Sequence, residues 1–315
     1  MQIAYLVLAH QQPKQVKRLV AALASKDCSF YIHVDKNVDI TPFQSELSSF
    51  EQVHLLQKHH REAGTWGDFG LVKGILQALR QIKRKEEPGY VILVSGQDYP
   101  LRSNKDIRSF LTENYGTCFI TCLPIPQSEW GARAVNRLNR YKITLSNKRF
   151  HFVLLPSIVE REFYRFKTAK NLLLSIFYHR FDAIYKIFQR RRFPSNLTPY
   201  GGDTWWALPN DIVQKILDFV DREPGYCSYH VDSLLADEIF FQSILMKIIQ
   251  SDERLVRPTL MYTNWSRKGV PLPVTFTMSD FGELKAAAHK KLFARKFDSG
   301  VDARILDQLD ELRCS

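Results

Sequence analysis

The chain has 315 residues, of which 45% are hydrophobic and 24% are charged, so it has enough apolar side chains to bury a sizeable core. This composition excludes a disordered chain, a collagen-like fibre and a coiled coil. The formal net charge is +11, which indicates a polyanionic partner, an anionic surface or a phosphate-bearing substrate.

Short apolar runs alternate with helical patterns in the N-terminal third of the chain. We predict strands at 3–9, 30–34, 52–56 and 90–95, with helices at 13–24 and 69–83. Such alternation is typical of βαβ units, so the sequence predicts an α/β fold with a mainly parallel central sheet flanked by helices. Further along we expect a strand at 204–208, helices at 212–220 and 237–249, and a strand at 257–262. We expect residues 1–315 to form one domain.

Polar residues gather where the predicted strands end. Open α/β sheets bind ligands beyond the carboxyl ends of their strands, so we expect the site to include the polar stretches 9–11, 33–36 and 95–101. His10 and His33 lie at two of these ends, where a lone histidine more often has a structural role. Trp66 is either a core residue or a stacking platform, and the pattern favours the core.

The segment 141–193 differs from the rest of the chain. It contains twelve Lys or Arg residues, three Asp or Glu residues, and twelve Phe or Tyr residues. We expect a basic, aromatic, helical insertion, and we expect the run 190–192 to add nothing to a core. The insertion either packs on the main domain with solvated cations or docks the protein on the cytoplasmic face of an anionic membrane.

Several common markers of enzyme families are missing from the sequence. There is no G-x-G-x-x-G, no P-loop, no G-x-S-x-G, no H-E-x-x-H and no Asp-x-Asp. The N-terminal residues resemble no signal peptide, and no apolar run is long enough for a membrane helix. Five cysteines occur without metal-ligand spacing, so we expect reduced thiols in a cytoplasmic protein: Cys28, Cys118, Cys122, Cys227 and Cys314.

Charged pairs near the C-terminus could carry chemistry. Asp237 and Glu238 open a predicted helix, where they either complement the helix dipole or supply a general base facing the ligand cleft. Two basic pairs lie beside aromatic residues, at 267–268 and 295–296. Such pairs are usually solvated, but these would also suit cations that contact a diphosphate.

Seven motifs occur in the order LAHQQP, FYIHVDK, TWGDFGLVKG, LVSGQDYPLRSN, GGDTWWAL, ADEIFFQSIL and FARKFD. In this order they resemble the core-2/I-branching β-1,6-N-acetylglucosaminyltransferases, a glycosyltransferase family (family 14) that also contains the peptide O-xylosyltransferases. The resemblance runs from Met1 to about Asp302 and is lost only in the basic insertion. It implies a GT-A-type fold and an inverting enzyme that needs no metal, which agrees with the missing Asp-x-Asp.

The resemblance also implies roles for individual residues. Glu238 matches the catalytic base of the family, and Lys296 matches the Lys that neutralises the departing UDP. An upstream Arg of the family has no match, because its spacing leads to the Pro271-Leu272-Pro273 stretch. Arg267 is the nearest candidate for this second diphosphate contact, and Lys268 and Arg295 are alternates.

Position in the motifs suggests the remaining contacts. We expect the nucleotide to be held by His10, His33 and Asp35 together with the cations above. We expect the sugar and acceptor sites to be shaped by Trp66, Asp98, Trp205, Trp206 and Asp237.

The expected reaction moves a sugar, GlcNAc being the first candidate, from a UDP-sugar to a hydroxyl of a glycan or lipid-linked glycan in β linkage. UDP-xylose is the alternative donor. We expect no cofactor and no metal. A non-enzymatic protein that binds nucleic acid or a membrane would also explain the charge, but a nucleic-acid partner would not explain why the motifs line strand ends. We therefore expect no nucleic acid, and a protein that is cytoplasmic and possibly peripheral on the inner face of the membrane.

Overall fold

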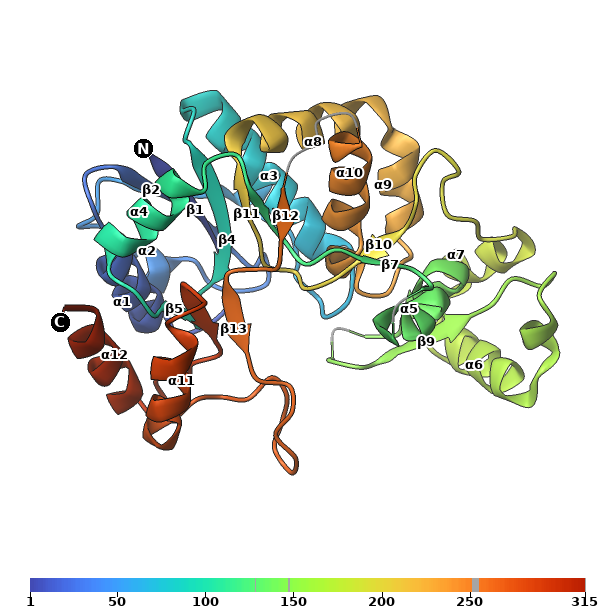
Figure 1. Cartoon of the computed structure of the whole chain (residues 1–315). Coiled ribbons are helices and arrows are strands. Elements are labelled where there is room, and N and C mark those ends of the chain that lie inside the picture. Colours follow the sequence, from blue (N-terminus) through green and yellow to red (C-terminus); the bar gives the residue numbers. More distant parts are fainter. Residues whose placement is uncertain (128, 147, 251–254, 315) are drawn as a thin grey trace.

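The computed structural model describes residues 1–127, 129–146, 148–250 and 255–314. Seven strands of these residues form the central sheet, in the order β12-β6-β11-β4-β1-β2-β3 (Figure 1). The strands are β1 (Ile3–Ala9), β2 (Cys28–Val34), β3 (Val53–Leu55), β4 (Tyr90–Ser95), β6 (Cys118–Phe119), β11 (Ala207–Pro209) and β12 (Val256–Arg257). Only β11 of these strands runs antiparallel to its neighbours, β4 and β6. The predicted α/β fold with a mainly parallel, helix-flanked sheet is confirmed.

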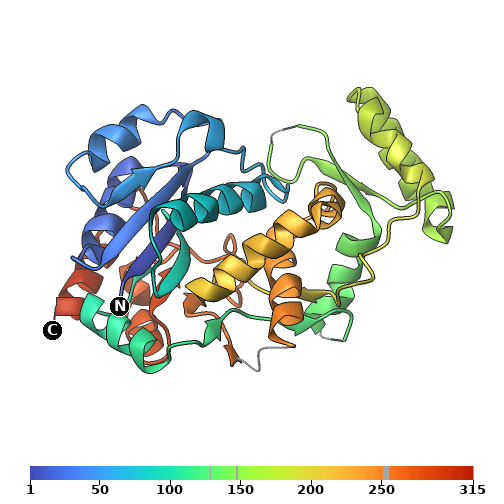
Figure 2. The same ribbon diagram turned by 90° about the horizontal axis from the view of Figure 1, so that it is seen from above.

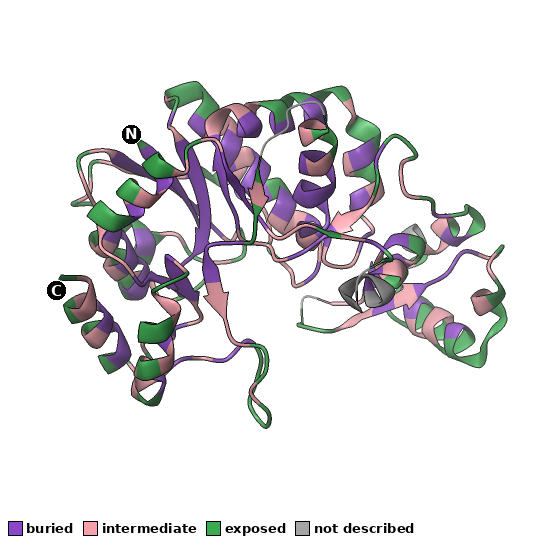
Figure 3. Cartoon of the chain, in the orientation of Figure 1, coloured by how far each residue is buried: buried purple, intermediate pink, exposed green. Residues whose placement is uncertain are grey.

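Helices cover both faces of this sheet, which explains why every residue of β1 and β2 is buried. One face packs against α1 (Pro13–Leu23), α2 (Thr41–Leu47), α4 (Asn104–Glu113), α11 (Phe281–Ala287) and α12 (Arg304–Cys314). The other face packs against α3 (Gly70–Lys85), α8 (Asn210–Arg222), α9 (Pro224–His230) and α10 (Phe240–Ile249). Strands buried on both faces have continuous apolar runs, as 3–9 and 90–95 do. Figure 3 shows the buried sheet between partly exposed helices.

Some predicted elements have different bounds. The expected strand at 257–262 is divided into β12 and β13 (Met261–Thr263), and Pro258 between them has no N–H for a strand ladder. The expected helix at 237–249 begins only at Phe240. Asp237 and Glu238 lie before it in a 3-10 turn, Ala236–Glu238, so they do not form the first turn of α10.

A three-stranded sheet attaches the C-terminal region to the carboxyl end of β4. It consists of β13, β14 (Phe293–Arg295) and β5 (Asp98–Pro100), and β14 runs antiparallel to β5 with Arg295 opposite Asp98. Asp98 is fully buried, and its Oδ1 lies 2.6 Å from Arg295 Nη1. The backbone N–H of Ser95 donates to Asp98 Oδ2 at 2.6 Å. This ion pair therefore joins β14 to the turn that follows β4.

Gln15 of α1 makes a second connection to the C-terminal region. Its side chain is buried and donates to the carbonyls of Gly96 at 2.8 Å and Phe297 at 3.1 Å. Its Oε1 accepts from the backbone N–H of Ser299 at 2.7 Å. Lys296, between β14 and these contacts, is thereby fixed next to the carboxyl ends of β1 and β4.

The insertion contains the expected helices and, in addition, a hairpin that was not predicted. It opens with an antiparallel hairpin of β8 (Tyr141–Thr144) and β9 (Phe152–Leu155), and continues with α6 (Phe166–Phe177) and α7 (Phe181–Ile184) between 3-10 turns. Alternate hairpin residues and Ile187 form a separate small core: Tyr141, Ile143, Val153, Leu155 and Ile187. Figure 2 shows this segment projecting beside the main sheet. The connecting elements are α5 (Glu129–Asn139), β7 (Leu123–Pro124) and β10 (Tyr200–Gly201).

Arg191 fastens the insertion to the main domain. Its side chain is buried and donates to the carbonyls of Leu138 and Tyr229, each at 3.0 Å, and to Ser233 Oγ at 2.6 Å. Its guanidinium also lies 4.2 Å from the centre of the Tyr229 ring. The expectation that 190–192 adds nothing to a core is therefore wrong for Arg191. Across the described ranges, we find no helix with the length and apolarity needed to cross a bilayer.

Asp98→Asn should lower the free energy of unfolding by about 3 kcal/mol, because Arg295 would keep its charge in a largely buried place without a counter-ion. Urea unfolding followed by circular dichroism measures the loss. Asp218→Asn is the matched control, since Asp218 forms an exposed pair with Lys83 at 3.1 Å and should contribute less than about 1 kcal/mol. Equal losses in the two variants would contradict the anchoring role of Asp98.

Candidate active site

The acidic pair before α10 combines one buried carboxylate with one that stays partly exposed. Asp237 is buried and accepts from Thr204 Oγ1 at 2.7 Å. Glu238 remains 24% exposed and forms an ion pair with Arg137 of α5. Burial and the neighbouring Asp237 raise the pKa of Glu238 to about 7, although Arg137 opposes the shift. A carboxylate with this pKa can accept a proton near neutral pH.

The Gly-Gly-Asp stretch lies against this pair. The backbone N–H of Gly202 donates to the Glu238 carbonyl at 2.9 Å. A Cβ on Gly202 would lie 1.9 Å from the carbonyl oxygen of Thr121, so only glycine allows this close approach. Burial raises the pKa of Asp203, and the Asp203 charge contributes to the raised pKa of Glu238. Motifs that lie far apart in the sequence therefore meet at Glu238.

Of the two predicted tryptophans at 205–206, the structure brings one to this site. The Arg295 guanidinium lies 4.4 Å from the centre of the Trp205 ring, and Arg295 is also the partner of Asp98. The preceding residue, Thr204, donates to Asp237, so this stretch contacts both the acidic pair and the C-terminal strand. Trp206 is only 2% exposed, and its ring packs 5.7 Å from Phe241 in the core beneath the site.

Cationic and titratable groups gather beyond the ends of β1 and β2. Burial, together with Arg295 and Arg149, lowers the pKa of Lys296. Partial desolvation and then Arg295 lower the pKa of His10, with a smaller contribution from Lys296, while Asp35 opposes the shift. These mutual effects show that the predicted residues His10, Asp35, Arg295 and Lys296 share one region of the molecule.

His33 lies beneath this region. It is buried, its Nε2 accepts from the backbone N–H of Glu62 at 2.9 Å, and burial lowers its pKa to about 4. Asp35 Oδ2 accepts from the backbone N–H of Gly64 at 2.6 Å. Both side chains therefore hold the loop that leads to Trp66.

A cavity of about 640 Å³ lies beside the loop that follows β2. Residues 36–40, residues 55–58 and Arg61 line it, together with Gln44. Arg61 donates to the backbone carbonyls of Val34 at 2.9 Å and Asp35 at 2.6 Å, which fixes one wall. The volume falls within the usual range for small-ligand sites.

Trp66 lies under the hairpin of the insertion, half-buried. The Phe150 and Phe152 rings lie 4.4 and 5.9 Å from it, and the Arg149 guanidinium lies 5.7 Å from its centre. Lys142 of β8 donates to the Trp66 carbonyl at 3.2 Å and forms an ion pair with Asp68. Arg149 thus contacts Trp66 and also influences Lys296, so the insertion reaches the cationic region.

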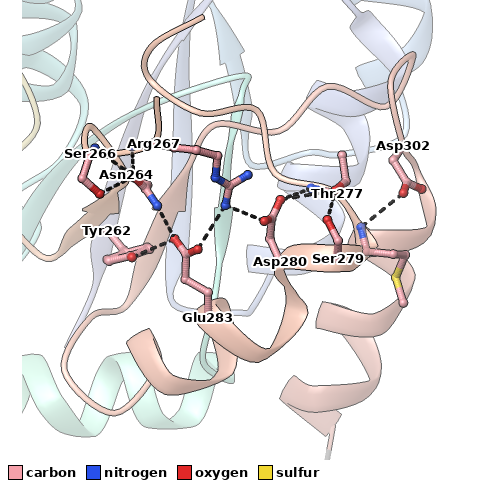
Figure 4. A network of polar contacts seen from close by, with 10 residues as sticks. Tyr262, Asn264, Ser266, Arg267, Thr277, Ser279, Asp280, Glu283 and Asp302 are labelled. Atoms are coloured by element: carbon pink, nitrogen blue, oxygen red, sulfur yellow. Dashed lines mark hydrogen bonds and ion pairs between the residues drawn. The ribbon is translucent and has the colours of Figure 1, made fainter. Parts of the chain in front are cut away.

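Arg267, the nearest sequence candidate for the second diphosphate contact, is held elsewhere. Figure 4 shows its guanidinium between two carboxylates, with Nη2 at 2.6 Å from Asp280 and 3.1 Å from Glu283. Glu283 also accepts from Tyr262 and Asn264, each at 2.8 Å. The charge of Arg267 is therefore already balanced within the C-terminal network.

Sequence reasoning missed four charged residues of the site: Arg137, Lys142, Arg149 and Asp203. The insertion carries Lys142 and Arg149, and the family motifs do not extend there. Asp203 lies inside the GGDTWWAL motif, so its place next to two glycines was an available signal. In the parts of the chain that the structure describes, no three His, Cys, Asp or Glu side chains are grouped as metal ligands.

Solved structures offer only a weak likeness. A 4-diphosphocytidyl-2C-methyl-D-erythritol synthase from Anaerococcus prevotii is 10% identical, with a TM-score of 0.37, over 91% of this chain and 96% of that chain. A likeness at this level has no bearing on function.

Sequence comparisons are more informative. Xylosyltransferase 2 of Homo sapiens is 26% identical over 334 residues, and xylosyltransferase 1 of Rattus norvegicus is 26% identical over 328 residues. Each match covers 98% of this chain, but 33% and 35% of the relatives, so the chain spans about one third of their length. The model of the Core-2/I-Branching enzyme family matches residues 3–287. The chain therefore belongs to the Core-2/I-Branching enzyme family, which is a family of glycosyltransferases.

Proposed function

We propose that the chain is an inverting, metal-independent glycosyltransferase that moves a sugar from a UDP-sugar to a hydroxyl of a glycan or lipid-linked glycan. GlcNAc is the first candidate sugar. Xylose is the second, because the curated relatives are named xylosyltransferases. The observation that carries the proposal is Glu238, a partly exposed carboxylate with a pKa near 7. Its neighbour Asp237 is bonded to Thr204, and the next residue, Trp205, packs against Arg295 beside Lys296. For a lipid-linked acceptor, the proposed place of the reaction is the cytoplasm, at the inner face of a membrane.

Glu238 has the properties that the nucleophilic step requires. A sugar hydroxyl is a weak nucleophile, so its proton must leave as its oxygen bonds to C1 of the donor sugar. In the proposed step the proton goes to Glu238, the bond between C1 and the β-phosphate oxygen breaks, and the electron pair leaves with UDP. Attack from the face opposite UDP inverts C1. Arg137 holds the Glu238 carboxylate in place and favours its ionised form.

The cations around Lys296 suit the departing diphosphate. Arg149, Arg295 and Lys296 lie close enough for the two arginines to lower the pKa of Lys296. Like charges held together repel one another, and a bound diphosphate would relieve this repulsion. Fixed cations also stabilise the negative charge that develops on the β-phosphate, a task that a metal ion performs in other enzymes. We therefore propose Arg149, rather than Arg267, as the second contact of the diphosphate.

His10 and Asp35 are the proposed contacts of the nucleoside. Both lie beyond parallel strands, where open α/β sheets bind their ligands. The cavity beside residues 36–40 begins directly after Asp35 and has room for a base and its ribose. His33 supports the same loop from below and would act as a positioning residue.

Glu238→Gln should lower kcat by about 10²-fold or more and leave UDP affinity nearly unchanged, because the amide keeps the size of the side chain and cannot accept the proton. In the unchanged protein, kcat/KM should rise with pH up to about 7 and then level off, because only the ionised carboxylate accepts a proton. Both are measured with a UDP-sugar donor and a glycan acceptor.

Arg137→Gln tests the predicted dependence of kcat/KM on pH. Arg137 lowers the pKa of Glu238, so its loss should move the rise in kcat/KM to higher pH. A Glu238→Gln enzyme with near-normal kcat would refute the assignment and make Asp237 the next candidate.

Lys296→Ala should weaken UDP binding by about 1.5–3 kcal/mol, the range for hydrogen bonds to charged groups, which is roughly 10- to 150-fold in Kd. Calorimetry in EDTA measures the loss, and the unchanged enzyme should bind UDP and transfer sugar in the same buffer. UDP binding that appears only after Mn²⁺ is added would contradict metal independence.

Arg149→Ala should also weaken UDP binding, by roughly 10-fold, since the guanidinium is more exposed than Lys296 and its contribution is more screened. Lys148→Ala is the matched control, because Lys148 is the adjacent exposed cation in the same hairpin connection. The same loss in both variants would mean that the hairpin contributes only through its overall charge.

A further inference from the structure

Helix α6 of the insertion presents large apolar side chains to solvent. Phe166, Leu173 and Phe177 are 87%, 67% and 73% exposed. Their spacing of seven and four residues places them on one face of the helix. We call these three residues the apolar stripe.

The side of α6 away from the stripe combines two buried polar residues with Leu172 and Leu174, which pack against the small core of the insertion. Thr168 is 6% exposed, and Ser175 is fully buried. Thr168 donates to the Glu162 carbonyl at 2.8 Å, and Ser175 to the Asn171 carbonyl at 2.9 Å. A helix on a water-soluble domain usually keeps charged and polar residues on its outer face, whereas the outer face of α6 carries the three large apolar residues of the stripe. The stripe is therefore left for a contact outside the chain.

The chain that follows α6 adds exposed aromatic residues. Phe181, Tyr185 and Phe188 are 59%, 61% and 63% exposed, and α7 contacts α6. Figure 3 shows exposed residues over much of this projecting segment. Apolar surface gathered in this way marks an interaction site in a soluble protein.

Cations surround the apolar stripe. Arg165, Lys167 and Lys170 are exposed, and Lys170 lies between Phe166 and Leu173 on the same face of α6. Within the described ranges, neither Lys167 nor Lys170 forms an ion pair. Arg165 has only a loose contact with Glu162, at 3.9 Å. The surface that carries the stripe is therefore strongly positive.

We propose that the stripe and its cations dock the chain on an anionic lipid bilayer. Phe and Leu side chains enter the acyl boundary, while Lys and Arg extend their charged ends to lipid phosphates. A second copy would bring an equally positive surface against the stripe, and a nucleic acid would leave the aliphatic Leu173 without a suitable contact. The docking does not depend on the proposed transfer reaction. Together with it, docking would hold the site beneath the hairpin near a lipid-linked acceptor.

Co-sedimentation of the full chain with vesicles tests the proposal. Binding to phosphatidylcholine vesicles should be weak at low salt, and replacing about a third of the lipid with phosphatidylglycerol should strengthen it at least 10-fold. Raising the NaCl concentration to about 0.5 M should weaken it again, since salt screens surface charge. A chain that stays in the supernatant with anionic vesicles at low salt would overturn the docking.

Matched variants distinguish the contribution of the stripe and its cations from that of exposed apolar and charged residues elsewhere on the surface. Leu173→Ser with Phe177→Ser should reduce vesicle binding at least 10-fold, whereas Tyr115→Ser with Val301→Ser, which are 64% and 62% exposed, should not. Lys167→Glu with Lys170→Glu should likewise reduce it more than Lys285→Glu with Lys290→Glu, a pair of exposed lysines in and after α11.

Two further outcomes would overturn the proposal. One is a dimer in solution that only the stripe variant dissociates. The other is binding of a single-stranded oligonucleotide without binding of vesicles. UDP affinity is measured on the same samples and should be equal in all four variants. An unchanged chain that binds UDP but not anionic vesicles would count against docking alone, and one that binds anionic vesicles but not UDP would count against the proposed function alone.

Discussion

The buried ion pair between Asp98 and Arg295 is the contact on which the site depends. It joins β14 to β5 at the end of β4, and Gln15 adds hydrogen bonds to the same region from α1. The chain between these contacts carries Lys296. A C-terminal strand is thus held against the N-terminal half of the sheet, and its cations are placed where UDP is proposed to bind. Asp98 is fully buried and paired with Arg295, so we propose that it positions the UDP-binding cations rather than shaping the sugar site directly.

Burial and neighbouring charges give the adjacent carboxylates Asp237 and Glu238 different properties. Asp237 lies deeper and is bonded to Thr204, whereas Glu238 keeps part of its surface and an arginine partner. The negative charge of Asp237 disfavours a second one beside it, while Arg137 prevents the pKa of Glu238 from rising further. Two adjacent carboxylates thereby acquire different environments, and Glu238 keeps part of its surface exposed, as the proposed general base requires.

The strands that lie inside the main sheet could be predicted because both of their faces are buried, which makes 3–9 and 90–95 continuous apolar runs. Glu238 and Lys296 could be selected because the motifs around them are intact. The hairpin of the insertion could not be predicted, because its apolar residues alternate over only four positions per strand and cover a small core. Nor does the sequence reveal that Arg191 is buried or that Trp206 faces the core while Trp205 stacks under Arg295. Those outcomes depend on contacts between distant segments.

The central claim is that a metal-free UDP site exists and that Asp98 holds its cations in place. Calorimetric titration with UDP in EDTA tests this claim most directly when Asp98→Asn is compared with Asp218→Asn at a temperature where both remain folded. The account predicts that the unchanged chain and Asp218→Asn bind UDP equally. Asp98→Asn should bind UDP roughly 10-fold more weakly, because a displaced cation would lose its charged contact with the diphosphate. Equal UDP affinity in all three proteins would contradict it.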